Sequence, residues 1–138
     1  MGLNRPSIDT GWAFTWEHKA SKLQFNGAAG VSFNFENTET NYQSGNEFHF
    51  DWAIGREVAT GLMLGIVGYD YRQLTGDSGP GATLGPLKGS VDAIGAGLSY
   101  TTVVHKHPLI LNLRHYQEFN VENRWEGNST LASATLKW

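Results

Sequence analysis

The stretch Glu47–Ile54, with the sequence EFHFDWAI, decides the fold class of this 138-residue chain. Its even-numbered residues are large and apolar, whereas its odd-numbered residues are charged, polar or small. The first set is Phe48, Phe50, Trp52 and Ile54, and the second is Glu47, His49, Asp51 and Ala53. Successive side chains of a β-strand point to opposite faces, whereas a helix would spread both sets around its axis. The stretch therefore predicts a strand with one apolar and one polar face.

The same period of two recurs on both sides of this stretch, and no segment carries a helical period. Strands are predicted at about residues 12–16, 23–33, 47–54, 62–72, 90–102, 109–121 and 129–138. The fourth of these is the least regular, because residues 62–67 (LMLGIV) are apolar at both parities. We assign Tyr69 and Tyr71 to its apolar face, which turns Asp70 and Arg72 toward the polar face.

The connections between these strands alternate strictly in length. Short turns are predicted at residues 18–22, 56–61 and 104–108, and longer loops rich in Gly, Asn and Ser at 37–46, 75–89 and 122–128. Short turns on one side and long loops on the other are typical of barrels in the bacterial outer membrane, whose strands alternate in hydrophobicity over about ten residues. We therefore expect an all-β, antiparallel up-and-down meander of about seven strands, forming part of a transmembrane β-barrel, with residues 1–138 as a single domain.

Composition excludes several other classes of protein. A net charge of −3 with scattered Lys and Arg residues provides no basic surface for nucleic acid. The chain has no cysteine, which excludes disulfides and thiolate metal sites. No stretch approaches the roughly 18 apolar residues of a spanning helix. The remaining combination, 12% aromatic residues with 17 glycines and a mean hydropathy of −0.34, favours strands with one polar face.

The two chain ends lead to separate expectations. The last strand follows a long loop, so it is predicted to end in the periplasm on Trp138, a terminal aromatic that resembles the signal read by the barrel-assembly machinery. The first strand precedes a short turn, so residues 1–6 are predicted to be extracellular. Natural single-chain barrels begin in the periplasm, have an even number of strands and leave no unpaired edge. We therefore expect a barrel that is N-terminally incomplete, completed by missing strands or by a second copy.

Several long motifs also resemble one family. They are residues 33–37 (FNFEN), 40–49 (TNYQSGNEFH), 67–79 (VGYDYRQLTGDSG), 84–86 (LGP), 118–119 (EF), 122–124 (ENR) and 126–127 (EG). In this order they are similar to the outer-membrane proteins called meta-pathway phenol degradation proteins, over nearly the whole chain. The resemblance implies an up-and-down barrel of roughly twelve strands that passes small, fairly apolar molecules, such as aromatic growth substrates, across the outer membrane.

Polar residues on the predicted strands are candidates for lining a pore. They are Glu47, His49, Asp51, Asp70, Arg72, Asp92, Asn112, Arg114, Tyr116 and Glu118. We expect Arg114 and Glu118 to pair across the lumen with Asp51, Arg72 or Asp92, either narrowing the pore or stiffening its wall. Tyr116 is the aromatic residue placed to touch a passing substrate.

Catalysis and metal binding have weak support in the sequence. Glu47, His49 and Asp51 share a face and could hold a metal, but polar lumen residues are the default in a barrel. No nucleophile elbow, phosphate-binding loop or paired-carboxylate cleft is recognisable, and the glycines of residues 76–89 do not open a helix. We therefore expect no enzyme activity, no catalytic residues, no metal and no cofactor.

Two classes of function remain open. In the first, the chain is an outer-membrane channel, or the C-terminal half of one, whose apolar face contacts lipid and whose partners are membrane lipid and a small hydrophobic substrate. In the second, it is a lipocalin-like barrel whose apolar face lines an internal pocket. A structural barrel fragment without transport activity is the remaining alternative. The first two alternatives give the two faces opposite roles. A channel with its apolar face outward needs detergent to stay dispersed, whereas a barrel with its apolar face inward does not, so dependence on detergent distinguishes them.

Overall fold

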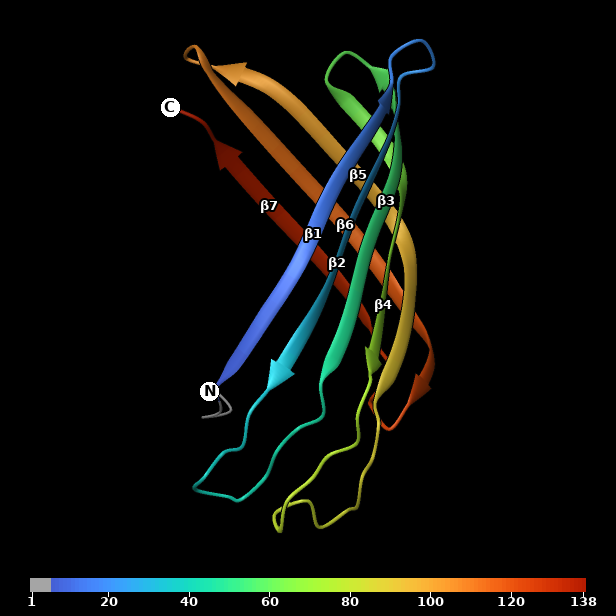
Figure 1. The fold of residues 1–138 in the computed structure, drawn as a ribbon. Coiled ribbons are helices and arrows are strands. Elements are labelled where there is room, and N and C mark those ends of the chain that lie inside the picture. The colour runs from blue at the N-terminus through green and yellow to red at the C-terminus, as the bar shows by residue number, and fades with distance from the viewer. Residues whose placement is uncertain (1–5) are drawn as a thin grey trace.

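The structure, a computed structural model, describes residues 6–138 as a single seven-stranded antiparallel sheet (Figure 1). The strands are β1 (Ser7–His18), β2 (Leu23–Asn34), β3 (Glu47–Ala59), β4 (Leu62–Gln73), β5 (Ser90–Val104), β6 (His107–Glu122) and β7 (Asn128–Leu136). Each pairs with the next in sequence order. The prediction of an all-β up-and-down meander of seven strands is therefore confirmed. Over the described part of the chain, no helix is long and apolar enough to cross a membrane.

The connections separate into two ends of the sheet. Short turns join β1 to β2, β3 to β4 and β5 to β6 at one end, which we call the turn end, and longer loops lie at the opposite loop end (Figure 1). The β5–β6 turn is tighter than predicted, with His105 and Lys106 alone between the strands at φ values of 49° and 71°. Positive φ at both central residues is what a type I′ hairpin turn requires, and this geometry matches the twist of the flanking strands.

The register divides the side chains between two faces. We call the face that carries Glu47, His49 and Asp51 the polar face. In β1, β3, β4, β5 and β7 the odd-numbered residues lie on it. In β2, and in β6 as far as Glu118, the even-numbered residues lie on it. The remaining strand residues form the apolar face, which includes Trp12 and Trp52. The predicted faces of β3, and the common face of Asn112, Arg114, Tyr116 and Glu118 in β6, are confirmed.

The polar face is the concave one. Four hydrophobic residues are buried among residues 6–138, and all of them lie on this face: Val67, Val91, Ala93 and Tyr116. The ring of Tyr69 on β4 reaches that of Tyr116 on β6 across the intervening β5, with 5.3 Å between centroids. On the apolar face, by contrast, large side chains stand in the open, with Trp12 87% exposed. The sheet therefore curls around its polar face, although its edges β1 and β7 remain unpaired within the described residues.

The assignment of faces in β4 was wrong. Asp70 pairs with Phe50 and Arg72 with Phe48, so both charged residues lie on the apolar face, whereas Tyr69 pairs with Asp51 on the polar face. Because residues 62–67 are apolar at both parities, local alternation could not fix the phase of this strand. Both residues lie near the loop end, where Arg72 forms ion pairs with Asp70 and with Asp92 of β5.

Hydrogen bonds tie the loops after β2 and β4 together. Gln43 and Ser78 exchange two backbone hydrogen bonds of 3.0 and 2.9 Å, and the backbone N–H of Gly45 donates to the Asp77 carboxylate. Asn34 is buried at the end of β2 and donates to the Gly45 carbonyl at 2.7 Å. The motif at residues 40–49 thus has a structural role, because it extends the sheet beyond its strands at the loop end.

Candidate functional site

The candidate site is the polar face, which divides into two halves of different chemistry. The loop half lies around Tyr69, Tyr116 and Glu118, and the turn half lies around Met63 and Arg114. A cavity of about 220 Å³ occupies the first and one of about 240 Å³ the second.

In the loop half, a tyrosine, a glutamate and a loop are joined by short hydrogen bonds. The Tyr69 hydroxyl donates to one Glu118 carboxylate oxygen at 2.5 Å, and the backbone N–H of Gly127 donates to the other at 2.8 Å. Tyr116 packs beside Tyr69 and is 6% exposed. These contacts pass over Ala93 and Gly95 of β5, whose small side chains leave room for the rings. Both oxygens of Glu118 are therefore occupied within the protein.

Further charged groups of the loop half have partners. Asp9 of β1 accepts hydrogen bonds from the Ser32 hydroxyl and from Nε2 of His49, the latter at 3.0 Å. The guanidinium carbon of Arg124, from the loop after β6, lies 4.2 Å from the centroid of the Tyr71 ring, within the range of a cation–π contact. Within residues 6–138, Asp51 also lines this half but forms no ion pair or hydrogen bond. Most charged groups of the loop half are therefore held by contacts within the protein.

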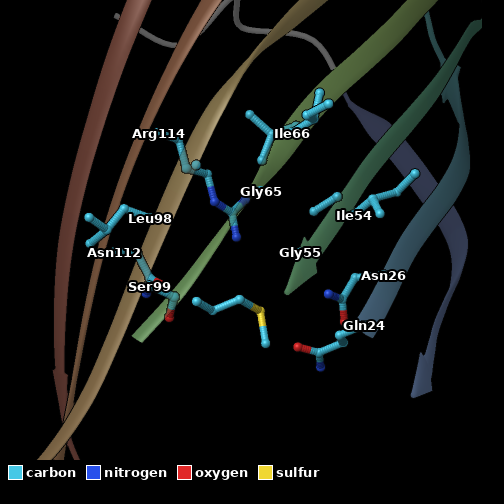
Figure 2. Close-up of a pocket in the computed structure, with 14 residues that line it drawn as sticks. Gln24, Asn26, Ile54, Gly55, Gly65, Ile66, Leu98, Ser99, Asn112 and Arg114 are labelled. Atoms are coloured by element: carbon cyan, nitrogen blue, oxygen red, sulfur yellow. The ribbon is translucent and has the colours of Figure 1, made fainter. Parts of the chain in front are cut away.

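The turn half carries a different arrangement, shown in Figure 2. Its cavity is lined from five strands, with the amides Gln24, Asn26 and Asn112, the Ser99 hydroxyl, Met63 and Arg114 among the lining residues. The Arg114 side chain extends from β6 into the space between the strands (Figure 2). Within residues 6–138, no carboxylate lies at ion-pair distance from Arg114, and no hydrogen bond holds its guanidinium.

The structure brings seven of the ten predicted pore-lining residues to one face and separates three from them. Glu47, His49, Asp51, Asn112, Arg114, Tyr116 and Glu118 share the polar face. Asp70, Arg72 and Asp92 lie on the apolar face, where Nη2 of Arg72 contacts Asp70 at 2.8 Å and Asp92 at 2.7 Å. The expected pairing of Arg114 or Glu118 with Arg72 or Asp92 across the lumen is therefore wrong. Asp51, the third expected partner, shares the polar face with Arg114 and Glu118, but no ion pair joins it to Arg114 within residues 6–138.

Sequence reasoning missed several residues of the polar face. Asp9, Arg124 and Gln24 were not predicted as site residues, and Tyr69 and Tyr71 were assigned to the opposite face. Asp9 and Gln24 follow the alternation of their own strands and could have been found by extending it. Arg124 lies in a loop, where no periodicity applies, so its contact with Tyr71 depends on how the loop folds back.

The geometry around Ser32 and His49 does not form a nucleophile and its base. Both side chains bind the same oxygen of Asp9, so no hydrogen bond joins the hydroxyl to the imidazole. Activation of a serine needs such a bond between serine and histidine. Among residues 6–138, no group of three or more His, Asp or Glu side chains is arranged to hold a metal ion.

Comparison with known proteins identifies the family. Searches of curated proteins and of solved structures found no match. A family model described as "Putative MetA-pathway of phenol degradation" matches residues 1–133. Because this match covers nearly the whole chain, the protein belongs to the phenol-degradation family that the sequence motifs resemble.

Proposed function

We propose that the sheet is part of the wall of an outer-membrane channel that admits small, fairly apolar molecules such as aromatic growth substrates. The observation that carries this proposal is the reversal of the usual burial pattern. The four hydrophobic residues that are buried among residues 6–138 all lie on the concave polar face, while the opposite face exposes residues such as Trp12, Phe14 and Ile66. Soluble proteins rarely expose such large contiguous apolar patches, whereas a barrel wall presents an apolar band to lipid and a polar surface to its interior.

Strand length also suits a membrane. The strands contain between 9 and 16 residues, and a tilted strand needs about 9–11 residues to cross the hydrocarbon core. The turns and loops lie at opposite ends, as in outer-membrane barrels. In lipid the edges β1 and β7 need partner strands from outside residues 6–138, because unpaired backbone groups in hydrocarbon cost several kcal/mol each.

The same arrangement opposes the lipocalin-like reading. That reading requires the apolar face to be concave, and here the concave face carries the polar residues.

We further propose that the chain is not an enzyme, since Ser32 and His49 are not hydrogen-bonded to each other. We propose small, fairly apolar substrates because the family is described by its connection with phenol degradation.

Single cysteines test the orientation of the faces, because the chain contains no native cysteine. Ser99 and Leu98 are neighbours on β5 that lie on the polar and the apolar face, respectively. In lipid vesicles, a membrane-impermeant, water-soluble thiol reagent should label Ser99→Cys, while Leu98→Cys should react much more slowly. Labelling after solubilisation in denaturant controls for thiol oxidation. Faster labelling of Leu98→Cys, or a monodisperse chain in buffer without detergent, would contradict the proposal.

Solute passage is tested separately. Vesicles containing the full chain should take up phenol or benzyl alcohol faster than vesicles containing a heat-denatured sample. Planar bilayers should show ionic conductance steps. Correct labelling of the two cysteines without any passage would favour a structural wall over a channel.

A further inference from the structure

We propose that Arg114 and the turn-half cavity bind the carboxylate of a small, single-ring organic acid. The inference shares with the proposed function the premise that the polar face is in contact with water, and it adds a class of ligand. The reasons are that Arg114 has no partner within residues 6–138, that the Asn26 amide stands as a donor on the same wall, and that the cavity has the size and lining for a small ring.

The first reason is charge. The carboxylates closest in the fold to this half of the sheet are Glu17 and Glu57, and both are engaged elsewhere. Glu57 forms an ion pair with Lys22, with 3.4 Å between Nζ and Oε2, and Glu17 accepts a hydrogen bond from the Gln24 amide. None of the Asp and Glu side chains that the structure describes lines the cavity. The guanidinium is thus free to bind an external carboxylate through two parallel hydrogen bonds, the pairing for which its geometry is suited.

The second reason is a donor beside Arg114, the Asn26 amide. The Asn26 side-chain oxygen accepts a hydrogen bond from the Thr15 hydroxyl at 2.9 Å. This leaves its NH₂ group as a donor on the cavity wall, because no other side-chain hydrogen bond of Asn26 occurs within residues 6–138. The Gln24 and Asn112 amides instead donate their NH₂ groups to Glu17 and Ser133, which leaves their oxygens as acceptors, so it is the positive charge of Arg114 that favours an anion over a cation.

The third reason is size and polarity. The cavity of about 240 Å³ is open on one side, and its enclosed part suits a molecule with one ring. Met63 and Val67 contribute an apolar part of the lining, against which a ring can lie while its carboxylate meets Arg114. A neutral ring would leave the guanidinium without an anion.

Arg56 provides a matched control for the charge of Arg114. The register runs from Arg56 through Leu64 and Leu98 to Leu113, so Arg56 lies at nearly the same level of the sheet as Arg114. It lies on the opposite, apolar face. Replacing either arginine removes one positive charge at this level, but Arg114→Gln alone removes it from the cavity.

The test measures binding by calorimetry with the full chain refolded in neutral detergent. Benzoate and benzamide serve as probes because they have similar shapes and differ in charge. Benzoate should bind about tenfold more tightly than benzamide, the size expected when one charge-assisted pair is lost. Arg114→Gln should reduce this preference to less than about twofold, Arg114→Lys should keep part of it, and Arg56→Gln should leave it unchanged. Circular dichroism verifies that each variant retains its strands.

Two results would overturn the inference. They are equal binding of benzoate and benzamide by the natural chain, and a benzoate preference that survives in Arg114→Gln. The proposed binding site and the proposed channel can be disproved separately. A chain that binds benzoate through Arg114 but passes no solute contradicts the channel and keeps the site, whereas conductance without benzoate preference does the reverse.

Discussion

The two halves of the polar face differ in residue types and in whether their central charged group is paired. In the loop half, Glu118 is held by Tyr69 and Gly127, while Asp9 is held by Ser32 and His49. In the turn half, Arg114 has no such partner within the described residues. The difference indicates that a charged residue on a strand face can be paired within the protein or remain available to a ligand. The contacts that it makes with neighbouring strands decide between these two outcomes.

The largest expected effect comes from filling the narrow gap under the loop half. A Cβ at Gly95 would overlap the carbonyl oxygen of His115 on β6, so Gly95→Ala must push two paired strands apart. We expect it to lower the free energy of unfolding by about 1–3 kcal/mol, the usual range for overpacking. Urea unfolding in lipid vesicles, followed by tryptophan fluorescence, measures the change.

Gly127→Ala is the control for this substitution. The nearest atom to a Cβ at Gly127 is a Glu118 carboxylate oxygen at 3.7 Å, an ordinary contact distance. Its stability should stay within about 0.5 kcal/mol of the natural chain, as for most surface substitutions. If Gly95→Ala lowered the free energy of unfolding no more than Gly127→Ala, the loop half would not be tightly packed around Gly95.

An intermediate effect is expected for Tyr69→Phe. The substitution keeps the ring beside Tyr116 and removes the hydroxyl that donates to Glu118. Because Glu118 keeps its bond from Gly127, we expect a loss of about 1.5–2 kcal/mol, the lower end of the range for one hydrogen bond to a charged group. The same urea titration measures it.

Tyr100→Phe is the matched control, since Tyr100 lies on the apolar face and is 39% exposed. Its hydroxyl makes no hydrogen bond within residues 6–138, so its removal should change the stability of the detergent-refolded protein by less than about 0.5 kcal/mol. If Tyr69→Phe changed the free energy of unfolding as little as Tyr100→Phe, the hydrogen bonds of the loop half would make no measurable contribution to stability.

The smallest effect is expected for Arg114→Gln. With no partner to lose, the turn half should keep its free energy of unfolding within about 0.5 kcal/mol. A loss above 1 kcal/mol in the urea titration would show that Arg114 is part of the fold after all, which would remove the contrast between the halves.

Much of the fold could be predicted from the sequence, and the exceptions have a common cause. Alternation in Glu47–Ile54 fixed both the strand and its two faces, because a period of two is a local property of the extended backbone. In β4 the same reasoning failed, since residues 62–67 are apolar at both parities and a shift of one residue exchanges the faces. Only pairing with β3 placed Tyr69 beside Asp51.

The sequence by itself determined the period, the seven strands, the alternation of turns and loops, and a polar face that includes Glu47, His49 and Asp51. The tertiary structure decided which face is concave and which residues meet across strands. It also decided that, within residues 6–138, Arg114 has no partner while Arg72 is held by two aspartates. The physical reason is distance along the chain. Alternation is set by neighbouring residues, whereas the contact of Tyr69 with Glu118 joins residues that come together only when the sheet registers and curls.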